Sequence, residues 1–243
     1  MLEKIFHQMS SRCSSTTKWF GTDTEERYRD NLKTQRKLLE EYGWIDSDFT
    51  YSFNSHGFRT DEFDVAISNP SVVFLGASIT MGTGVPIECT WADKISKELK
   101  LHHCNLGISG GSNDSAFRVA NHYIPAIKPK LVIFVSGYPN RLDLITDQKV
   151  FTFVPSMDNA LPEHAEFYKD WIIHEENGKL NYLKNRYAVL HLCSNLDIPV
   201  IELEDHVLFK LGISSRGRDL LHPGIEGNAK IADYVLEKLG DAG

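Results

Sequence analysis

Short apolar runs alternate with amphipathic stretches through the middle of the chain. Val72–Leu75 and Leu131–Ser136 are continuous and rich in β-branched and aromatic residues, which is typical of strands buried on both faces of a parallel sheet. The stretch 90–101 has apolar residues at helical spacing and predicts a crossover helix. The full pattern predicts strands at 72–75, 103–106, 131–136 and 198–203, and helices at 90–101, 114–127, 162–176, 179–195 and from about 225 onward.

The alternation of strand and helix implies right-handed crossovers and a parallel sheet with helices on both faces. The stretch 139–162 has a weak pattern and is predicted to be an irregular excursion. Asn177-Gly178 is predicted to break the chain between the helix at 162–176 and the helix at 179–195.

The N-terminal part has a different pattern. Residues 1–21 are polar and predict a loose arm, and a helix is expected from Thr22 to Gly43. The segment 51–59 reads as a short extended piece with a glycine turn that packs Phe53 and Phe58 onto the main domain. A second interpretation is that its polar residues, Asn54, Gly57 and Arg59, line a site. The domain prediction is an arm and helix, 1–50, packed on a main domain, 51–243.

Composition narrows the function classes. A chain of 243 residues suits one α/β domain, and a net charge of -7 argues against a protein that grips nucleic-acid backbones. No apolar run of about 18 residues predicts a membrane span, and the first residues lack the pattern of a secretory signal. The four scattered cysteines favour reduced thiols and a cytoplasmic location, although a mature secreted chain would look the same. The oligomeric state is left open.

Ser78 follows the first strand and Gly76, where the carboxyl ends of parallel strands bind ligands. A serine hydroxyl becomes a nucleophile when an imidazole accepts its proton and a carboxylate orients that imidazole. Asp219 and His222 meet this need from a loop after the last strand, at the same edge of the sheet. The simpler interpretation, that Ser78 only caps a helix, is left open by this stretch alone.

An ester carbonyl under attack needs hydrogen-bond donors aimed at its developing negative charge. Three donors follow three different strands: the N–H of Ser78, the N–H of Gly110 and the side-chain amide of Asn140. Asn113 is the fallback for the amide. These donors predict an oxyanion hole at the rim that carries Ser78.

The order G-x-S, S-G, Asn and D-x-x-H-P resembles the SGNH, or GDSL-like, hydrolases. The resemblance covers about 51–239 and implies a flavodoxin-like, three-layer α/β/α sandwich around a mainly parallel sheet of four to five strands. It implies a serine esterase without metal or cofactor, with Ser78 as nucleophile, His222 as general base and Asp219 as its orienting carboxylate. A short acyl group on a carbohydrate is the substrate suggested by this analogy.

Two positions depart from the family pattern. G-D-S is G-A-S here, so that Ala77 replaces a carboxylate, and G-x-N-D is Y-P-N-R, with Arg141 after Asn140. These changes motivate an alternative, a binding domain with weak or no catalysis. A lipid-type esterase and an acyltransferase that use the same triad are further alternatives. His102-His103 does not predict a metal site, because consecutive strand residues point to opposite faces.

Overall fold

The computed structural model describes residues 12–146, 150–154 and 162–241. Its centre is a four-stranded parallel sheet in the order β4-β3-β5-β8. The strands are β3 (Ser71–Leu75), β4 (His102–Asn105), β5 (Leu131–Ser136) and β8 (Val200–Glu204). Phe74 pairs in register with Asn105 on one side and Ile133 on the other. All four predicted strands are therefore confirmed, and their carboxyl ends share one edge.

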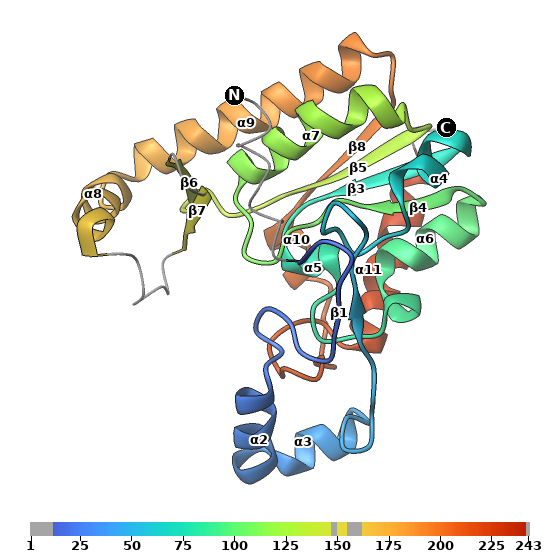
Figure 1. Cartoon of the computed structure of the whole chain (residues 1–243), viewed down its shortest axis with the longest axis vertical. Coiled ribbons are helices and arrows are strands. Elements are labelled where there is room, and N and C mark those ends of the chain that lie inside the picture. The colour runs from blue at the N-terminus through green and yellow to red at the C-terminus, as the bar shows by residue number, and fades with distance from the viewer. Residues whose placement is uncertain (1–11, 147–149, 155–161, 242–243) are drawn as a thin grey trace.

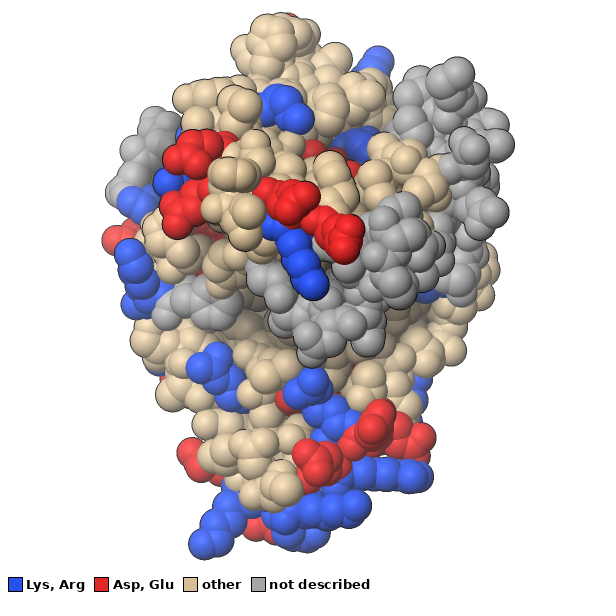
Figure 2. All heavy atoms as spheres, turned by 90° about the vertical axis from the view of Figure 1, so that its left-hand side faces the viewer, with Lys and Arg blue, Asp and Glu red and all other residues tan. Residues whose placement is uncertain are grey.

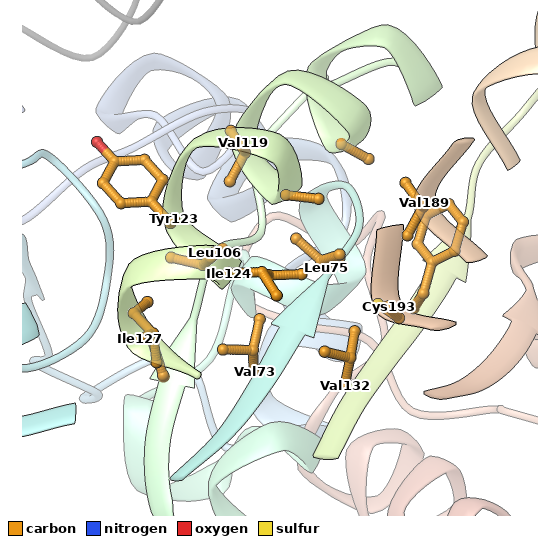
Figure 3. Packing of buried hydrophobic residues seen from close by; sticks show 14 of the residues in the cluster. Val73, Leu75, Leu106, Val119, Tyr123, Ile124, Ile127, Val132, Val189 and Cys193 are labelled. Atoms are coloured by element: carbon orange, nitrogen blue, oxygen red, sulfur yellow. The ribbon is translucent and has the colours of Figure 1, made fainter. Parts of the chain in front are cut away.

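Helices cover both faces of this sheet (Figure 1). One face packs on α4 (Phe63–Ser68), α7 (Asn113–Ile127) and α9 (Glu175–Asn195), and the other on α6 (Trp91–Leu99) and α11 (Ile225–Asp241). Successive strand residues alternate between the faces, so Val73 and Leu75 join the first layer while Val72 and Phe74 join the second. Figure 3 shows the first layer, with Val73, Leu75 and Val132 beneath the residues of α7. The predicted three-layer sandwich is confirmed.

Helices α6 and α7 each begin at a residue whose side-chain hydroxyl caps the helix. The side chain of Thr90 accepts a hydrogen bond from the N–H of Asp93 at the start of α6. Ser112 and Ser115 form a reciprocal capping box at the start of α7. These caps fix where each helix begins, and so they fix the loops at the carboxyl edge of the sheet.

The N-terminal prediction is wrong in two respects. The described residues 12–21 are not a loose arm, because β1 (Thr16–Thr17) pairs with β2 (Tyr51–Ser52) in an antiparallel ribbon. The expected helix is two helices, α2 (Glu25–Thr34) and α3 (Arg36–Glu41), separated by the non-helical residue Gln35. Tyr51 and Phe53 belong to a third apolar cluster, built with Leu39 and Trp44 of the N-terminal part. The division at residue 50 stays a prediction.

Two predictions for 139–195 also need correction. The excursion after β5 contains a hairpin, β6 (Leu142–Ile145) and β7 (Val150–Phe153), and is not wholly irregular. The break between α8 (Pro162–Ile172) and α9 falls before Glu175, and Gly178 lies inside α9. A Cβ on Gly178 would come 2.8 Å from the carbonyl oxygen of Pro139, so this glycine permits close packing and does not end a helix.

The remaining elements are short: α5 (Ser78–Met81), the 3-10 turn η2 (Ile87–Cys89) and α10 (Asp205–Phe209). Among the described residues, no helix has the length and apolar character needed to cross a bilayer. Figure 2 shows acidic and basic side chains lying side by side at its lower end, where α2 and α3 lie.

Candidate active site

The turn that carries Ser78 is formed by its own local sequence. β3 ends at Leu75, and Gly76 adopts a φ of +156°, where a Cβ would lie 2.3 Å from Oγ1 of Thr80. Only glycine fits this position, because a side chain would collide with the helix that follows. Ala77 is the N-cap, and Ser78 is the first residue of α5. The hydroxyl of Ser78 is therefore not used as a helix cap.

Three side chains bind backbone carbonyls of this turn and hold it in place. They are Trp91 on Ile79 (3.1 Å), Asn105 on Thr80 (2.7 Å), and Arg59 on Gly82 (2.6 Å) and Val85 (2.9 Å). Arg59 is buried, its guanidinium lies 4.5 Å from the ring centre of Tyr51, and burial lowers its pKa to about 10. Arg59 thus braces the turn from behind, and the interpretation of 51–59 as a packing segment is confirmed.

Asp219, His222 and Ser78 form a continuous hydrogen-bonded chain. Oγ of Ser78 lies 2.7 Å from Nε2 of His222, and Nδ1 of His222 lies 2.6 Å from Oδ2 of Asp219. Oδ1 of Asp219 accepts the N–H groups of Leu221 (3.0 Å) and His222 (3.1 Å), which fixes the carboxylate. Since Nδ1–H donates to Asp219, Nε2 is left as the acceptor for the Ser78 hydroxyl.

Thr22 adds a fourth group from the N-terminal part of the chain. Its hydroxyl donates to Oδ2 of Asp219 at 2.6 Å and lies 3.3 Å from Nδ1 of His222. Burial raises the pKa of Asp219, but the hydrogen bonds and charge of His222 and the bond from Thr22 outweigh burial and bring the pKa below its usual value. The carboxylate therefore stays ionised, as an imidazole-orienting group must.

The loop 214–222 is held by the N-terminal part through buried polar contacts. Arg218 and Asp23 are each 1% exposed and form an ion pair at 2.8 Å. The Arg218 guanidinium lies between the rings of Trp19 (4.2 Å) and Phe49 (3.9 Å) and donates to the Lys18 carbonyl at 2.6 Å. Burial raises the pKa of Asp23, and its bonds with Arg218 and Tyr51 oppose this.

Two aromatic side chains extend the same contact. The indole N–H of Trp44 donates to the carbonyl of Arg216 at 2.7 Å, and the hydroxyl of Tyr42 donates to the carbonyl of Ser214 at 3.0 Å. Side chains of residues 12–50 therefore supply hydrogen-bond donors to backbone carbonyls of the loop 214–222. These contacts lie within eight residues of His222 in the chain.

The three predicted anion donors lie around one cavity, called the site cavity. It has a volume of about 430 Å³ and is lined by Thr22, Ser78, Gly110, Asn140, Arg141 and His222, among others. Within the described part of the chain, the N–H groups of Ser78 and Gly110 and the amide of Asn140 make no hydrogen bonds. Gly110 has a φ of +74°, which favours glycine. The three donors are thus available to a ligand.

The fallback residue Asn113 is already engaged. Its buried side-chain amide binds both backbone groups of Gly137, accepting at 2.8 Å and donating at 3.2 Å. It orients the loop after β5 and is not among the residues that line the site cavity. The same loop is anchored further on by Asp143, which accepts from Ser112 (2.7 Å) and Arg118 (2.5 Å) of α7. Asn140 lies between these two anchors.

Two polar residues near the site do not belong to any motif of the sequence. Thr22 stood in a stretch assigned to the start of a helix, although the neighbouring Trp19 and Phe20 in a polar arm were a signal of packing. Asp205 follows β8 directly, so the rule that placed the other candidates at the ends of strands also applies to it.

A comparison with models of protein families gives no match, and a search of curated proteins gives none. Among solved structures, the chain is similar to an esterase of Pseudoalteromonas sp. at 13% identity and a TM-score of 0.39, covering 71% of this chain and 97% of that one. It is similar to a lipase/acylhydrolase of Enterococcus faecalis at 15% identity and a TM-score of 0.38, covering 70% and 94%.

A GDSL-like lipase of Bacteroides thetaiotaomicron has 11% identity and a TM-score of 0.35, and the match covers 85% of this chain and 97% of that one.

Proposed function

We propose that this chain is a serine ester hydrolase of the SGNH type, in which Ser78 is the nucleophile. His222 is the general base, Asp219 is its orienting carboxylate, and the N–H groups of Ser78 and Gly110 with the Asn140 amide form the oxyanion hole. The substrate is an ester with a short acyl group, and no metal or cofactor takes part in these steps.

In the first step, Oγ of Ser78 attacks the ester carbonyl while its proton passes to Nε2 of His222. The carbonyl oxygen becomes an anion that the three donors stabilise. The carbon–oxygen bond to the alcohol then breaks, and the alcohol leaves with the proton of His222. Asp219 stabilises the transient imidazolium without taking its proton.

In the second step, His222 removes a proton from water, and the resulting hydroxide attacks the acyl-enzyme. The acid leaves, and the proton on His222 returns to Ser78. An acceptor alcohol in place of water would give acyl transfer by the same steps, so the products decide between the two reactions.

One observation supports this proposal most directly. A serine hydroxyl, an imidazole and an ionised carboxylate are joined at 2.7 and 2.6 Å beside a cavity with three available donors. A chain held only for binding would not need the base oriented by a buried carboxylate. Ala77 and Arg141 leave this chain of bonds intact, which favours catalysis over the alternative of an inactive binding domain.

The test is covalent labelling with a fluorophosphonate, together with hydrolysis of an aryl acetate. We expect labelling and acid release by the wild type and neither by Ser78→Ala. Ser194→Ala, at an exposed serine of α9, is the matched control and should behave as the wild type. Absence of Ser78-dependent labelling and hydrolysis would overturn the proposal.

A cytoplasmic location is part of the same proposal. Cys89, Cys104 and Cys193 form no disulfide among the described residues, and Cys104 and Cys193 are buried. Fractionation of cells that express the full chain would test this.

A further inference from the structure

A second, smaller pocket opens beside Ser78, and we call it the side pocket. It has a volume of about 100 Å³, and its lining includes Ser78, His222, Tyr138, Arg141 and Asp205. Gly110 and Asn140 line the site cavity but not this pocket. The two spaces share Ser78, Tyr138, Arg141 and His222, but only the site cavity has the donors Gly110 and Asn140, and only the side pocket has the carboxylate of Asp205.

Asp205 is the unusual residue of the side pocket. It is only 7% exposed, yet its carboxylate makes no hydrogen bond or ion pair with any residue that the structure describes. Burial raises its pKa, and the charges of Arg141, His222 and His206 oppose this. Its oxygens are not among the fully enclosed unpartnered atoms of the described residues, so they face the pocket, and a ligand that displaces water from the pocket must supply a donor to them.

Arg141 lines the same pocket and provides the opposite chemistry. One Nη1–H donates to the Gly111 carbonyl at 3.0 Å, and the guanidinium lies 5.4 Å from the ring centre of Tyr138. These contacts fix the plane of the guanidinium and leave other N–H donors for the pocket. Burial lowers the pKa of Arg141, while Asp205 and two tyrosines oppose this.

A hydroxyl group satisfies both residues, because it can donate to a carboxylate and accept from a guanidinium. An alkyl group would desolvate both charges and pair with neither. An ammonium group would meet the like charge of Arg141, and a carboxylate or phosphate would meet that of Asp205. Of these groups, only the hydroxyl fits the pair.

The position of the pocket indicates which part of the ester it receives. The leaving alcohol takes its proton from Nε2 of His222, so its oxygen must lie beside that ring. Leu221 and Pro223, on either side of His222 in the chain, both line the side pocket. Beyond it, a cavity of about 420 Å³ shares Tyr138 and Asp205 and adds the ring of Tyr182. An alcohol with several carbons can therefore extend past Asp205.

We propose that Asp205, with Arg141, binds a hydroxyl group of the alcohol part of the substrate, so that the enzyme prefers esters of polyhydroxylated alcohols. This inference rests on the proposed function of Ser78. Asp205 is a specificity residue that contacts the substrate and takes no part in proton transfer.

Two acetates that differ only in hydroxyl groups test this: 2,3-dihydroxypropyl acetate and propyl acetate. The wild type should hydrolyse the first with a kcat/KM at least about tenfold higher, since a hydrogen bond to a charged group contributes at least that factor. In Asp205→Ala the ratio should fall to near one. In Asp205→Asn, which keeps shape and one acceptor, it should be intermediate. Asp233→Ala, an exposed carboxylate of α11, should keep the wild-type ratio.

An unchanged ratio in Asp205→Ala, or an equal loss for both esters, would overturn the inference while Ser78-dependent hydrolysis upheld the proposed function. If neither ester is hydrolysed, binding to Ser78→Ala decides the inference by itself. The dihydroxypropyl ester should then bind about tenfold more tightly, in an NMR titration, to Ser78→Ala than to Ser78→Ala/Asp205→Ala. Equal binding to the two variants would refute the role of Asp205.

Discussion

Ser78 and His222 meet at one hydrogen bond, but the two loops that carry them are held by different means. The Ser78 turn is formed by a buried strand, Gly76 and a short helix that follow one another in the chain, and side chains of Arg59, Trp91 and Asn105 bind its backbone carbonyls. The His222 loop carries one isolated β-bridge, between Arg216 and Pro223, and it is further held by Thr22, Asp23 and Trp44, whose partners in the loop lie 172 to 197 positions away in the chain. The backbone of the first loop is therefore shaped mainly by consecutive residues, whereas the second loop depends more on partners that are distant in the chain.

Changes at the Ser78 turn should act on the reaction itself, because the fold of the sheet does not depend on the hydroxyl. Changes in the N-terminal part should act on the position of His222, because they remove partners of buried backbone and charged groups.

The largest effect is expected from Asp219→Asn. An amide leaves the imidazole in the wrong tautomer, so kcat for an aryl acetate should fall about 10³- to 10⁴-fold with the fold intact. Steady-state kinetics measures kcat, and circular dichroism shows whether the fold is retained. Unchanged kcat would mean that another carboxylate orients His222.

The next largest effect is expected at the buried ion pair of Asp23 and Arg218. Asp23→Ala leaves the Arg218 guanidinium buried and unpaired, so the free energy of unfolding should fall by about 3–5 kcal/mol in urea titration. A double variant, Asp23→Leu with Arg218→Met, should recover most of this loss, since an apolar pair avoids the desolvation of charges. If Asp23→Ala is as stable as the wild type, the N-terminal part does not hold the loop in the way described.

A smaller effect is expected at Thr22. Thr22→Val keeps the shape and removes the hydrogen bond to Asp219, which should lower kcat about tenfold and leave KM unchanged. Thr22→Ser should restore kcat, and Thr34→Val, at an exposed residue of α2, serves as the control. A purely structural role would instead lower Tm in Thr22→Val, with no loss of kcat at temperatures where the protein is folded.

The smallest expected effect is a gain in stability, at Asp205. Asp205→Asn removes an unpaired buried charge and should raise the free energy of unfolding at pH 7 by about 1 kcal/mol. The pKa of Asp205 is raised in the folded state, so its penalty is complete above that pKa and vanishes as pH falls below the unfolded value of about 3.9. In urea titrations, the gain in free energy of unfolding of Asp205→Asn over the wild type should be smaller at pH 4 than at pH 7. A constant gain would exclude ionisation of Asp205 as its cause.

Much of the fold could be predicted from the sequence because its elements have strong local patterns. The buried strands and the glycine turn at Gly76 lie where short-range rules place them. Gly178 shows the limit of those rules. It has the pattern of a helix break but lies inside α9, because that helix needs close contact with Pro139.

For the site itself, the sequence alone determined the candidates and their common edge. Parallel strands separated by helices must bring their carboxyl ends together, so Ser78, Gly110, Asn140, Asp219 and His222 could be assigned to one rim without coordinates. It could not determine what holds the second loop or what lies beside it. Those contacts join residues far apart in the chain, such as Thr22 and Asp219, and the local pattern of apolar and polar residues does not predict them.

The tertiary structure decided two further matters: that the N-terminal part completes the Asp219–His222 pair, and that Asp205 lies buried beside Ser78 without a partner. The physical reason is the same for both. Burial and hydrogen bonding of a polar group depend on everything packed around it, whereas strand and helix patterns depend on a few neighbours along the chain.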